Sequence, residues 1–263
     1  MAISSPLSGL RILITNDDSI HAPGLKALEK IANSITPDVW TVAPKVGQSG
    51  KSFSVTFDDI LRVEELSPRR FSVSGTPADC VYIALGEILK DHKPDLILSG
   101  INSGSNIANF IGMSGTVGAT FAGASRNIKS IAISQDFANT PPTKFSAVES
   151  YLPQIIRRLL SFTWDDGVCM NVNFPEAKPG EIGGIKVARQ GQFDVVWNVF
   201  KRTDPCDNTY YWLRSSQTDK GKVIDSDVEL LMQKKAITIT PLQCRHEHSD
   251  SIDKLKELFS ANV

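Results

Sequence analysis

Residues 12–18 read Ile-Leu-Ile-Thr-Asn-Asp-Asp, an apolar strand that runs directly into two adjacent carboxylates. Successive side chains of a strand point to opposite faces, so Asp17 and Asp18 cannot converge inside it. They can converge in the turn beyond it, where two carboxylates about 5 Å apart repel by roughly 3 kcal/mol at an effective dielectric of about 20. A shared proton, a basic neighbour or a bound divalent cation must offset that repulsion. The alternative is a solvated turn whose Asp caps the next helix.

The residues after this stretch predict a strand–helix–strand unit. Pro23 stands at the start of a segment with apolar residues at helical spacing up to Ile35. Residues 39–43 then form a short apolar run that Pro44 ends. Such a βαβ unit has a right-handed crossover.

The rest of the first half continues the same alternation. Residues 53–73 alternate between apolar and polar and predict a small antiparallel excursion. Further helices are predicted from Thr76 to Ile88 and, through small residues, from Thr116; further strands are predicted over 95–98 and 128–134. The fold class that we predict is α/β, a doubly wound, Rossmann-like and mostly parallel sheet.

The second half is less regular. We expect a helix over 144–162 that Pro153 kinks or restarts, and strands over 169–174, 185–188 and 236–240. Residues 190–227 are polar and turn-rich with interleaved aromatics, which is typical of a projecting β arm or a subunit contact. We predict one domain over 1–263, with a core at about 10–190 and 228–245, an arm at about 191–227 and a C-terminal helix at about 249–260.

Composition limits the classes of partner. The net charge of −1 gives no electrostatic reason to expect a nucleic-acid polymer or an anionic membrane. The four cysteines show neither CxxC nor zinc spacing, which favours free thiols in a reducing compartment. The first ten residues lack the features of a signal peptide, and no apolar run is long enough to span a membrane. We therefore expect a cytoplasmic protein.

Three polar loops leave the predicted strand ends, at 16–19, 43–50 and 99–106. In an open parallel sheet, ligands collect outside the carboxyl ends of the strands, so all three loops can face one crevice. They offer oxygen: two carboxylates, hydroxyls such as Ser49, and the amide carbonyl of Asn102 or Asn106. That set suits Mg²⁺ or Mn²⁺ better than zinc. For the two asparagines, the alternative is ordinary turn chemistry.

Ser114-Gly115-Thr116 stands at the start of the predicted small-residue helix. Hydroxyls and free backbone amides at a helix N-terminus form an anion site, although a simple helix cap is the commoner use of such residues. A cation held by carboxylates beside an anion site is the pairing that phosphate-ester hydrolysis needs.

Other motifs fit less well. Residues 48–52 resemble the end of a P-loop, but Lys45 stands where that pattern needs Gly. No GxGxxG follows the first strand, and a haloacid-dehalogenase-type phosphatase would need Asp-x-Asp rather than adjacent aspartates. His246-Glu247-His248 has metal-ligand residue types but reads as a solvated loop, and His21 and His92 are either proton carriers or surface residues.

Taken together, five segments in order resemble the SurE family, the stationary-phase survival proteins that are 5′/3′-nucleotidases. These segments are RILITNDDSIHAPGLKAL, VAPKVGQSG, VSGTPADCVYIAL, PDLILSGINSGSN and MSGTVGATFAGA, with weaker similarity in MNVNFP, TDPCDNTYYW and ITITPL. The resemblance implies hydrolysis of nucleoside monophosphates, with short polyphosphate as a further substrate of some members. It also implies dimers or tetramers that exchange C-terminal segments.

The resemblance further implies that Asp17, Asp18, Ser49 and Asn102 bind one divalent cation, Mg²⁺ or Mn²⁺, and that the two aspartates are catalytic. Residues 114–116 match the phosphate-holding segment. We also expect two asparagines to contact the substrate: Asn16, in the loop of the two aspartates, and Asn106, in the loop of Asn102. The expected partner is thus a small nucleotide, with no membrane and no nucleic-acid polymer.

Two departures from the family pattern stand out. Ser19 follows the paired aspartates where the family usually has Gly, and Lys45-Val46-Gly47-Gln48 lacks the usual arginines. If residue 19 needs positive φ, Ser strains the turn by roughly 1–3 kcal/mol. Both departures would support an alternative function, a nucleotide-binding or regulatory module with the same fold and little turnover.

Overall fold

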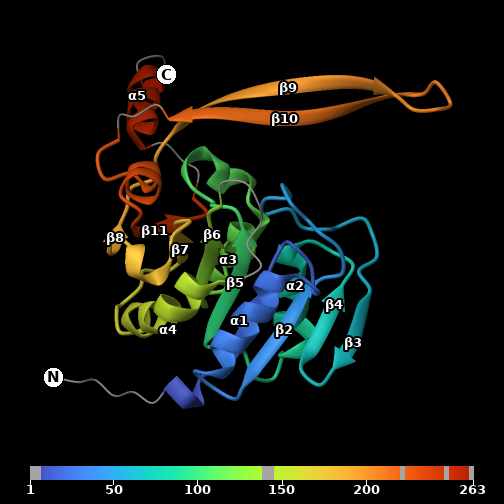
Figure 1. The fold of residues 1–263 in the computed structure, drawn as a ribbon, viewed down its shortest axis with the longest axis vertical. Coiled ribbons are helices and arrows are strands. Elements are labelled where there is room, and N and C mark those ends of the chain that lie inside the picture. The colour runs from blue at the N-terminus through green and yellow to red at the C-terminus, as the bar shows by residue number, and fades with distance from the viewer. Residues whose placement is uncertain (1–6, 138–144, 220–222, 246–248, 261–263) are drawn as a thin grey trace.

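A computed structural model describes residues 7–137, 145–219, 223–245 and 249–260 of the chain (Figure 1). A large mixed sheet has the strand order β3-β4-β2-β1-β5-β6-β7-β11-β8, and β9 and β10 pair separately. The strands are β1 (Ile12–Thr15), β2 (Val39–Pro44), β3 (Val63–Ser67), β4 (Arg70–Val73), β5 (Leu96–Ser103), β6 (Lys129–Gln135), β7 (Val168–Phe174), β8 (Ile185–Val187), β9 (Phe193–Thr203), β10 (Thr209–Asp219) and β11 (Ile237–Gln243).

The longer helices are α1 (Pro23–Asn33), α2 (Pro77–Ile83), α3 (Gly115–Ala124), α4 (Ser146–Leu160) and α5 (Ser249–Ser260). Short helical segments are η1 (Leu7–Gly9), η2 (Ala84–Ile88), η3 (Ala108–Met113), η4 (Pro179–Glu181) and η5 (Glu229–Gln233). No helix among these described segments is long and apolar enough to cross a bilayer.

The order of the strands places a topological switch point between β1 and β5. Strands β4, β2, β1, β5, β6 and β7 run parallel, whereas β11 is antiparallel to β7. From β1 the chain moves outward to β2 and β4, and it returns to the other side of β1 as β5. The predicted doubly wound α/β sheet is therefore confirmed, and its ligand crevice is expected outside the carboxyl ends of β1 and β5.

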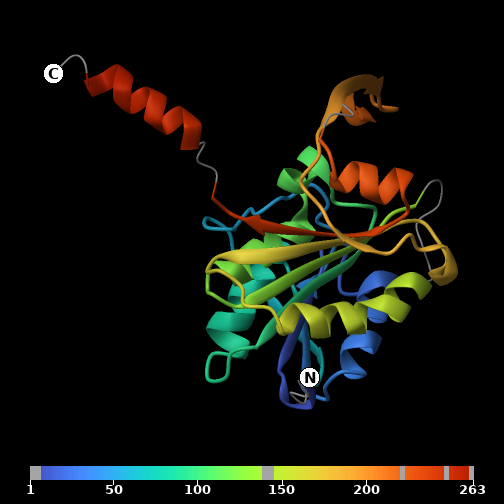
Figure 2. The same ribbon diagram turned by 90° about the vertical axis from the view of Figure 1, so that its left-hand side faces the viewer.

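The central strands are apolar throughout because both faces of the sheet are covered. In β1, Ile12 and Ile14 pack in the cluster beneath α1 and α4, while Leu13 packs on the opposite face beneath α2. Figure 2 shows α1 and α4 together on one side of the sheet and α2 on the other. The apolar run at residues 12–14 is thus the signature of a parallel strand buried on both faces.

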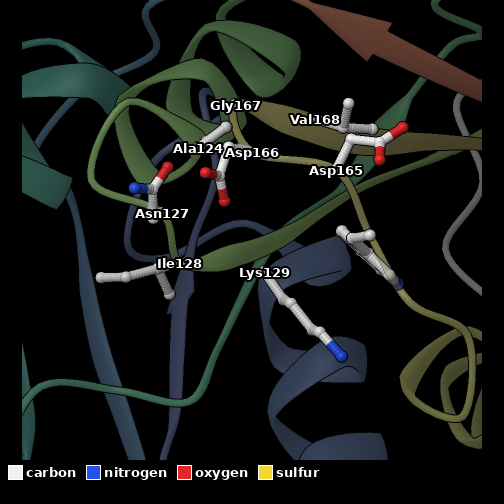
Figure 3. A pocket seen from close by; sticks show the side chains of 9 residues that line it. Ala124, Asn127, Ile128, Lys129, Asp165, Asp166, Gly167 and Val168 are labelled. Atoms are coloured by element: carbon white, nitrogen blue, oxygen red, sulfur yellow. The ribbon is translucent and has the colours of Figure 1, made fainter.

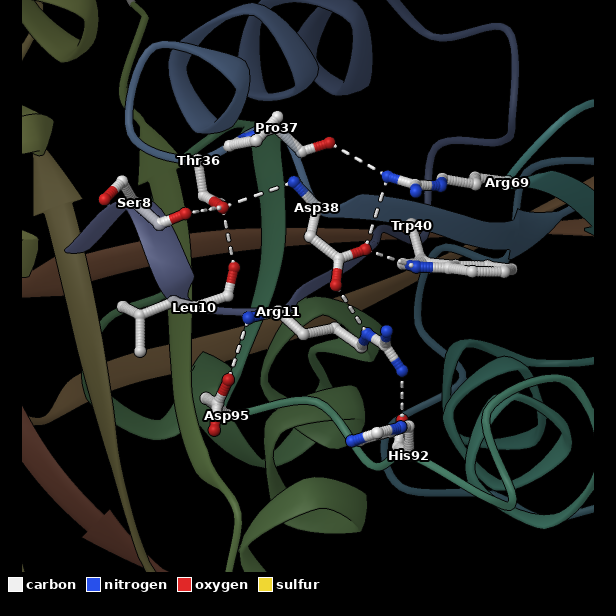
Figure 4. Close-up of polar contacts among 10 residues, drawn as sticks. All are labelled: Ser8, Leu10, Arg11, Thr36, Pro37, Asp38, Trp40, Arg69, His92 and Asp95. Atoms are coloured by element: carbon white, nitrogen blue, oxygen red, sulfur yellow. Dashed lines mark hydrogen bonds and ion pairs between the residues drawn. The ribbon is translucent and has the colours of Figure 1, made fainter. Parts of the chain in front are cut away.

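A polar cluster at the amino ends of these strands, opposite their carboxyl ends, fixes how the strands are aligned (Figure 4). The backbone N–H of Arg11 donates to Asp95 Oδ2 at 2.8 Å, just before β5, and its Nε donates to Asp38 Oδ2 at 2.8 Å, just before β2. The indole of Trp40 donates to the other oxygen of Asp38 at 2.9 Å. One arginine therefore sets the starts of three neighbouring strands, and through their register it sets where their carboxyl ends emerge.

The predicted antiparallel excursion over 53–73 is only partly present. Strands β3 and β4 form it from residue 63 onward, but residues 53–62 are a loop, and Phe57 is 87% exposed. Phe53 covers α3 from this loop, its ring 6.1 Å from that of Phe121. The alternating apolar residues of this loop pack onto the helical layer, and they do not form a strand. Helix α4 continues through Pro153 without a break, so of the two alternatives for this proline, a kink or a restart, the restart is wrong.

Strands β9 and β10 form a two-stranded arm that extends away from the sheet (Figure 1). Beyond the base of the arm, its large apolar side chains from Val196 to Leu213 are exposed on both faces, and in Figure 2 helix α5 also lies apart from the sheet. This arm at residues 193–219 lies within the segment 190–227, where the interleaved aromatics predicted a projecting β arm or a subunit contact.

Candidate metal and phosphate site

Asp17 lies in the turn after β1 and points toward the first turn of α3. The hydroxyl of Thr116 donates to Asp17 Oδ1 at 2.6 Å, and the Asp17 side chain is almost fully enclosed, since the residue is 4% exposed. A Cβ on Gly115 would stand 2.9 Å from Asp17 Cβ and 3.1 Å from its Oδ2. Only glycine allows the helix to approach the carboxylate this closely.

Burial raises the pKa of Asp17 to about 6. Loss of solvation is the main cause and the charge of Asp18 adds to it, while the hydrogen bond from Thr116 opposes both. In the protein without a bound cation, Asp17 therefore ionises only above about pH 6, so its charged form is less favoured than that of an exposed aspartate. A cation beside it would favour the charged form.

Asp18 is only half-buried and stands at the end of β5. The backbone N–H of Ser103 donates to Asp18 Oδ2 at 3.3 Å, and burial raises the pKa of the Asp18 carboxyl. Asn102, the neighbour of Ser103, donates its Nδ2 to Gly104 O at 2.8 Å. That bond uses the amide nitrogen of Asn102, which leaves its Oδ1 as the atom able to bind a ligand.

The second loop is attached to the first, and the residues that follow it are attached to η3 and packed against α3. The backbone N–H of Gln48 donates to Asp17 O at 2.7 Å, and Ser52 donates its hydroxyl to Gly112 O at 2.6 Å. A Cβ on Gly118 would be 2.1 Å from Ser52 O, which explains the small residues that the sequence shows in α3. Ser49 is exposed in this loop, adjacent to Gln48, and has no hydrogen bond in the described structure. The structure thus attaches the loop of Ser49 to Asp17 through the neighbouring Gln48.

Asn106 is held by residues that the sequence analysis did not single out. Its N–H donates to Asn173 Oδ1 at 2.7 Å, and its carbonyl accepts from Asn171 Nδ2 at 2.7 Å and Asn173 Nδ2 at 3.1 Å. Its own Nδ2 donates to Ser134 Oγ at 2.8 Å. The N-x-N spacing in β7 was the available signal, because residues two apart share one face of a strand.

The two hydroxyl groups at the start of α3, those of Ser114 and Thr116, have different roles. The Ser114 hydroxyl accepts from Val117 N at 3.1 Å, as an ordinary N-cap does. The Thr116 hydroxyl is directed to Asp17, not outward. The backbone N–H of Thr116 also stabilises the charged Asp17 carboxylate, so the N–H of Gly115, the first residue of the helix, is the donor left for an anion.

The oxygen atoms gathered here fit a hard divalent cation. Asp17 and Asp18 supply two carboxylates, and Asn102 supplies an amide oxygen. Asn16 is fully buried with its Oδ1 lacking a hydrogen-bond donor. Within the described residues no three His, Cys, Asp or Glu side chains converge as a metal cluster, so amide and hydroxyl oxygens must complete the ligand set.

Ser19 has a positive φ of 116°. This is a backbone conformation that glycine, the residue usual at this position in the family, adopts without strain. Its carbonyl accepts from Asn16 Nδ2 at 2.9 Å and from Ala22 N at 3.1 Å, which closes the turn. Despite the strain, Asp17 and Asp18 reach Thr116 and Ser103. Serine is therefore compatible with the site geometry.

Other candidates lie elsewhere. His21 is exposed, and His92 contributes its backbone carbonyl to Arg11 at the far edge of the sheet (Figure 4). His246-Glu247-His248 lies outside the described residues.

A cavity of about 90 Å³ at the starts of β6 and β7 is lined by Lys129, Asp165 and Asp166, at the edge opposite the aspartate pair (Figure 3).

A family model, curated relatives and a solved structure all indicate the same family for this chain. Residues 12–196 match the model of "Survival protein SurE". The chain is 42% identical over 256 residues to 5′-nucleotidase SurE of Parvibaculum lavamentivorans, covering 96% of this chain and 92% of the relative. It is 40% identical to 5′-nucleotidase SurE of Paramagnetospirillum magneticum, covering 96% of each. The crystal structure of the SurE protein from Aquifex aeolicus superposes with a TM-score of 0.80 at 32% identity, covering 94% of this chain and 99% of that one.

Replacing Ser19 by glycine should stabilise the protein. Relief of positive-φ strain, about 1–3 kcal/mol, exceeds the entropy that glycine adds to the unfolded chain, about 0.4–1 kcal/mol. We expect Ser19→Gly to raise the free energy of unfolding by about 1 kcal/mol in urea denaturation. As a control, Ser161→Gly makes the same change at a helix end with φ −79° and should not stabilise. Equal or lower stability of Ser19→Gly would contradict the assignment of strain.

Proposed function

The chain belongs to the SurE family, and from this membership and the geometry of its site we propose that it is a nucleotidase. In this proposal it is a divalent-metal-dependent phosphomonoesterase that hydrolyses nucleoside 5′- and 3′-monophosphates to nucleoside and phosphate. The observation that carries the proposal is the contact between Asp17, at the end of β1, and Thr116 in the first turn of α3. It joins a carboxylate pair to a helix N-terminus, and phosphate-ester hydrolysis needs both.

One Mg²⁺ or Mn²⁺ per subunit would be held by Asp17, Asp18, Asn102 Oδ1 and Ser49. When bound, the cation neutralises phosphoryl charge and lowers the pKa of a water molecule. Uncatalysed hydrolysis of phosphate monoesters is so slow that accelerations of up to ~10²¹ are required, and charge stabilisation in a fixed geometry supplies the largest share.

The residues of the chain divide the remaining tasks. Thr116 fixes Asp17 in one orientation, so this carboxylate serves as the rigid anchor. Asp18 is more exposed, and only its Oδ2 has a hydrogen bond, from Ser103 at 3.3 Å. Its other oxygen can orient the attacking water and accept its proton. The N–H of Gly115, together with Asn106, would bind the phosphate oxygens.

Phosphate release from a panel of 5′- and 3′-nucleoside monophosphates, with and without Mn²⁺ or Mg²⁺, tests the proposal. We expect release with metal and none with chelator, and we expect Asp18→Asn to reduce kcat/KM at least ~100-fold, because the proton acceptor is lost. Short polyphosphate belongs in the panel as a possible side substrate.

The matched control is Asp166→Asn, which makes the same change in the cavity at the opposite edge of the sheet and should keep full activity. Full turnover by both Asp17→Asn and Asp18→Asn would contradict the assigned roles. Binding of AMP without phosphate release under any metal would instead identify a nucleotide-binding module.

The arm supports a second proposal, that the protein is a homodimer or homotetramer that exchanges C-terminal segments. Side chains paired across β9 and β10 share a face, so Val199 and Leu213 lie together, next to Trp197 and Tyr211. Each of these four side chains is more than half exposed. On the other face a hollow of about 320 Å³ is lined by Phe200, Arg202, Trp212 and Arg214. Apolar area of this kind on a projecting arm is typical of an interface.

Light scattering coupled to gel filtration tests this proposal. The wild-type protein should have the mass of two or four chains, and Trp197→Ser with Leu213→Ser should lower that mass, because the double change removes the apolar face of the arm. Phe162→Ser alters an exposed apolar residue outside the arm and should leave the mass unchanged. A monomeric wild-type protein would refute the proposal.

A further inference from the structure

Ala108 is a buried non-glycine residue with a left-handed backbone, at φ 52°. It lies two residues after Asn106 and opens η3, the segment that leads to the N-cap of α3 at Ser114. Ala108 therefore stands between Asn106 and the start of α3, the two parts of the phosphate-binding half of the proposed site. An L-residue holds such a conformation only where its surroundings enforce it.

Both peptide groups of Ala108 are bound by side chains from the far end of the sequence. Its N–H donates to Asp227 Oδ2 at 3.0 Å, and its carbonyl accepts from Gln190 Nε2 at 2.8 Å. The other oxygen of Asp227 accepts from Gly191 N at 2.8 Å and Val228 N at 2.9 Å. Asp227 is completely buried, and the three hydrogen bonds of its carboxylate join the loop after β5 to the base of the arm and to the start of η5.

A second pair of bonds strengthens this junction. The backbone N–H of Phe193, the first residue of β9, donates to Asn109 Oδ1 at 3.0 Å, and Asn109 Nδ2 donates to Phe193 O at 3.3 Å. The ring of Phe193 packs against Phe110, 5.9 Å between centroids. Residues 108–110 are thus fixed by the arm base over their whole length.

We propose that Asp227 is a positioning residue for the phosphate-binding half of the site. It holds Ala108 in its left-handed conformation, and it thereby sets where Asn106 and the start of α3 lie relative to Asp17. The inference rests on the proposed nucleotidase function for its kinetic consequence, but the clamp itself is a property of the folded chain.

Asp227→Asn tests the role of the carboxylate at nearly constant volume. All three partners of Asp227 are N–H donors, so the amide nitrogen of asparagine must face a donor and one bond is lost. We expect kcat/KM for a nucleoside monophosphate to fall about 10- to 100-fold, since misplacement of a substrate-positioning group by about 1 Å has an effect of that size. The Mn²⁺ concentration giving half-maximal activity should change little, because the clamp does not contact Asp17, Asp18 or Ser49.

Rescue separates positioning from general stability. Glycine adopts positive φ at no steric cost, so adding Ala108→Gly to Asp227→Asn should restore most of the lost kcat/KM. Lys235 has nearly the same backbone, at φ 50°, outside this loop, so adding Lys235→Gly relieves equal strain without restoring activity. Wild-type kcat/KM in Asp227→Asn, or equal rescue by Lys235→Gly, would overturn the proposal.

Hydrogen exchange tests the clamp without reference to turnover. In Asp227→Asn the amides of residues 104–114 should exchange at least about tenfold faster than in the wild type, while those of β1 and β6 stay unchanged. Unchanged exchange at 104–114 would overturn the clamp even if the wild-type protein proved inactive. If Asp227→Asn fails to fold, Gln190→Ala at an exposed position removes the other half of the clamp and should give a smaller loss in the same assays.

Discussion

The burial of one carboxylate beside another is the constraint on which this structure depends. Asp17 is 4% exposed next to Asp18, and the arrangement persists because Thr116 donates to it and Gly115 leaves it room. The first turn of α3 can approach only because the helix carries small residues where it meets Ser52. The site is thus a consequence of close packing between the end of β1 and the start of α3.

The distant parts of the chain serve the same arrangement. Arg11 aligns β1, β2 and β5 at one edge of the sheet, so the loops that carry Asp17 and Asn102 emerge together at the other edge. Asn171 and Asn173 in β7 hold Asn106, and Asp227 holds Ala108. Residues from both halves of the chain therefore fix one crevice, and the base of the arm forms part of its support.

The sequence was sufficient for the sheet and for the meeting of the loops. Buried parallel strands are continuously apolar, and the carboxyl ends of such strands share an edge, so β1, β5 and the candidate residues after them were predictable. The ligand set implied by the family resemblance stays a prediction, while the glycine that the family usually has at position 19 was the signal for the positive φ of Ser19.

Contacts between residues far apart in the chain were not predictable. Nothing local indicates that Asp227 reaches Ala108, or that the Thr116 hydroxyl turns to Asp17 while Ser114 only caps the helix. The alternation at 53–57 was misleading, because a loop that covers a helical layer places apolar residues at the same spacing as a strand. Pro153 likewise sits within one helix, since burial of Leu152, Ile155 and Ile156 offsets the lost hydrogen bond.

Calorimetric titration of Mn²⁺ into the metal-free protein, in buffers of different ionisation enthalpy, tests most directly whether the carboxylate pair is a cation site. Since the pKa of Asp17 is raised to about 6, the metal-free protein carries a proton there below that pH and must release it when a cation binds. The account predicts one ion per chain, release of up to one proton at pH 5.5 and almost none at pH 8, and affinity that weakens as the pH falls through about 6. Binding with the same affinity at both pH values and without proton release, or no binding at all, would contradict it.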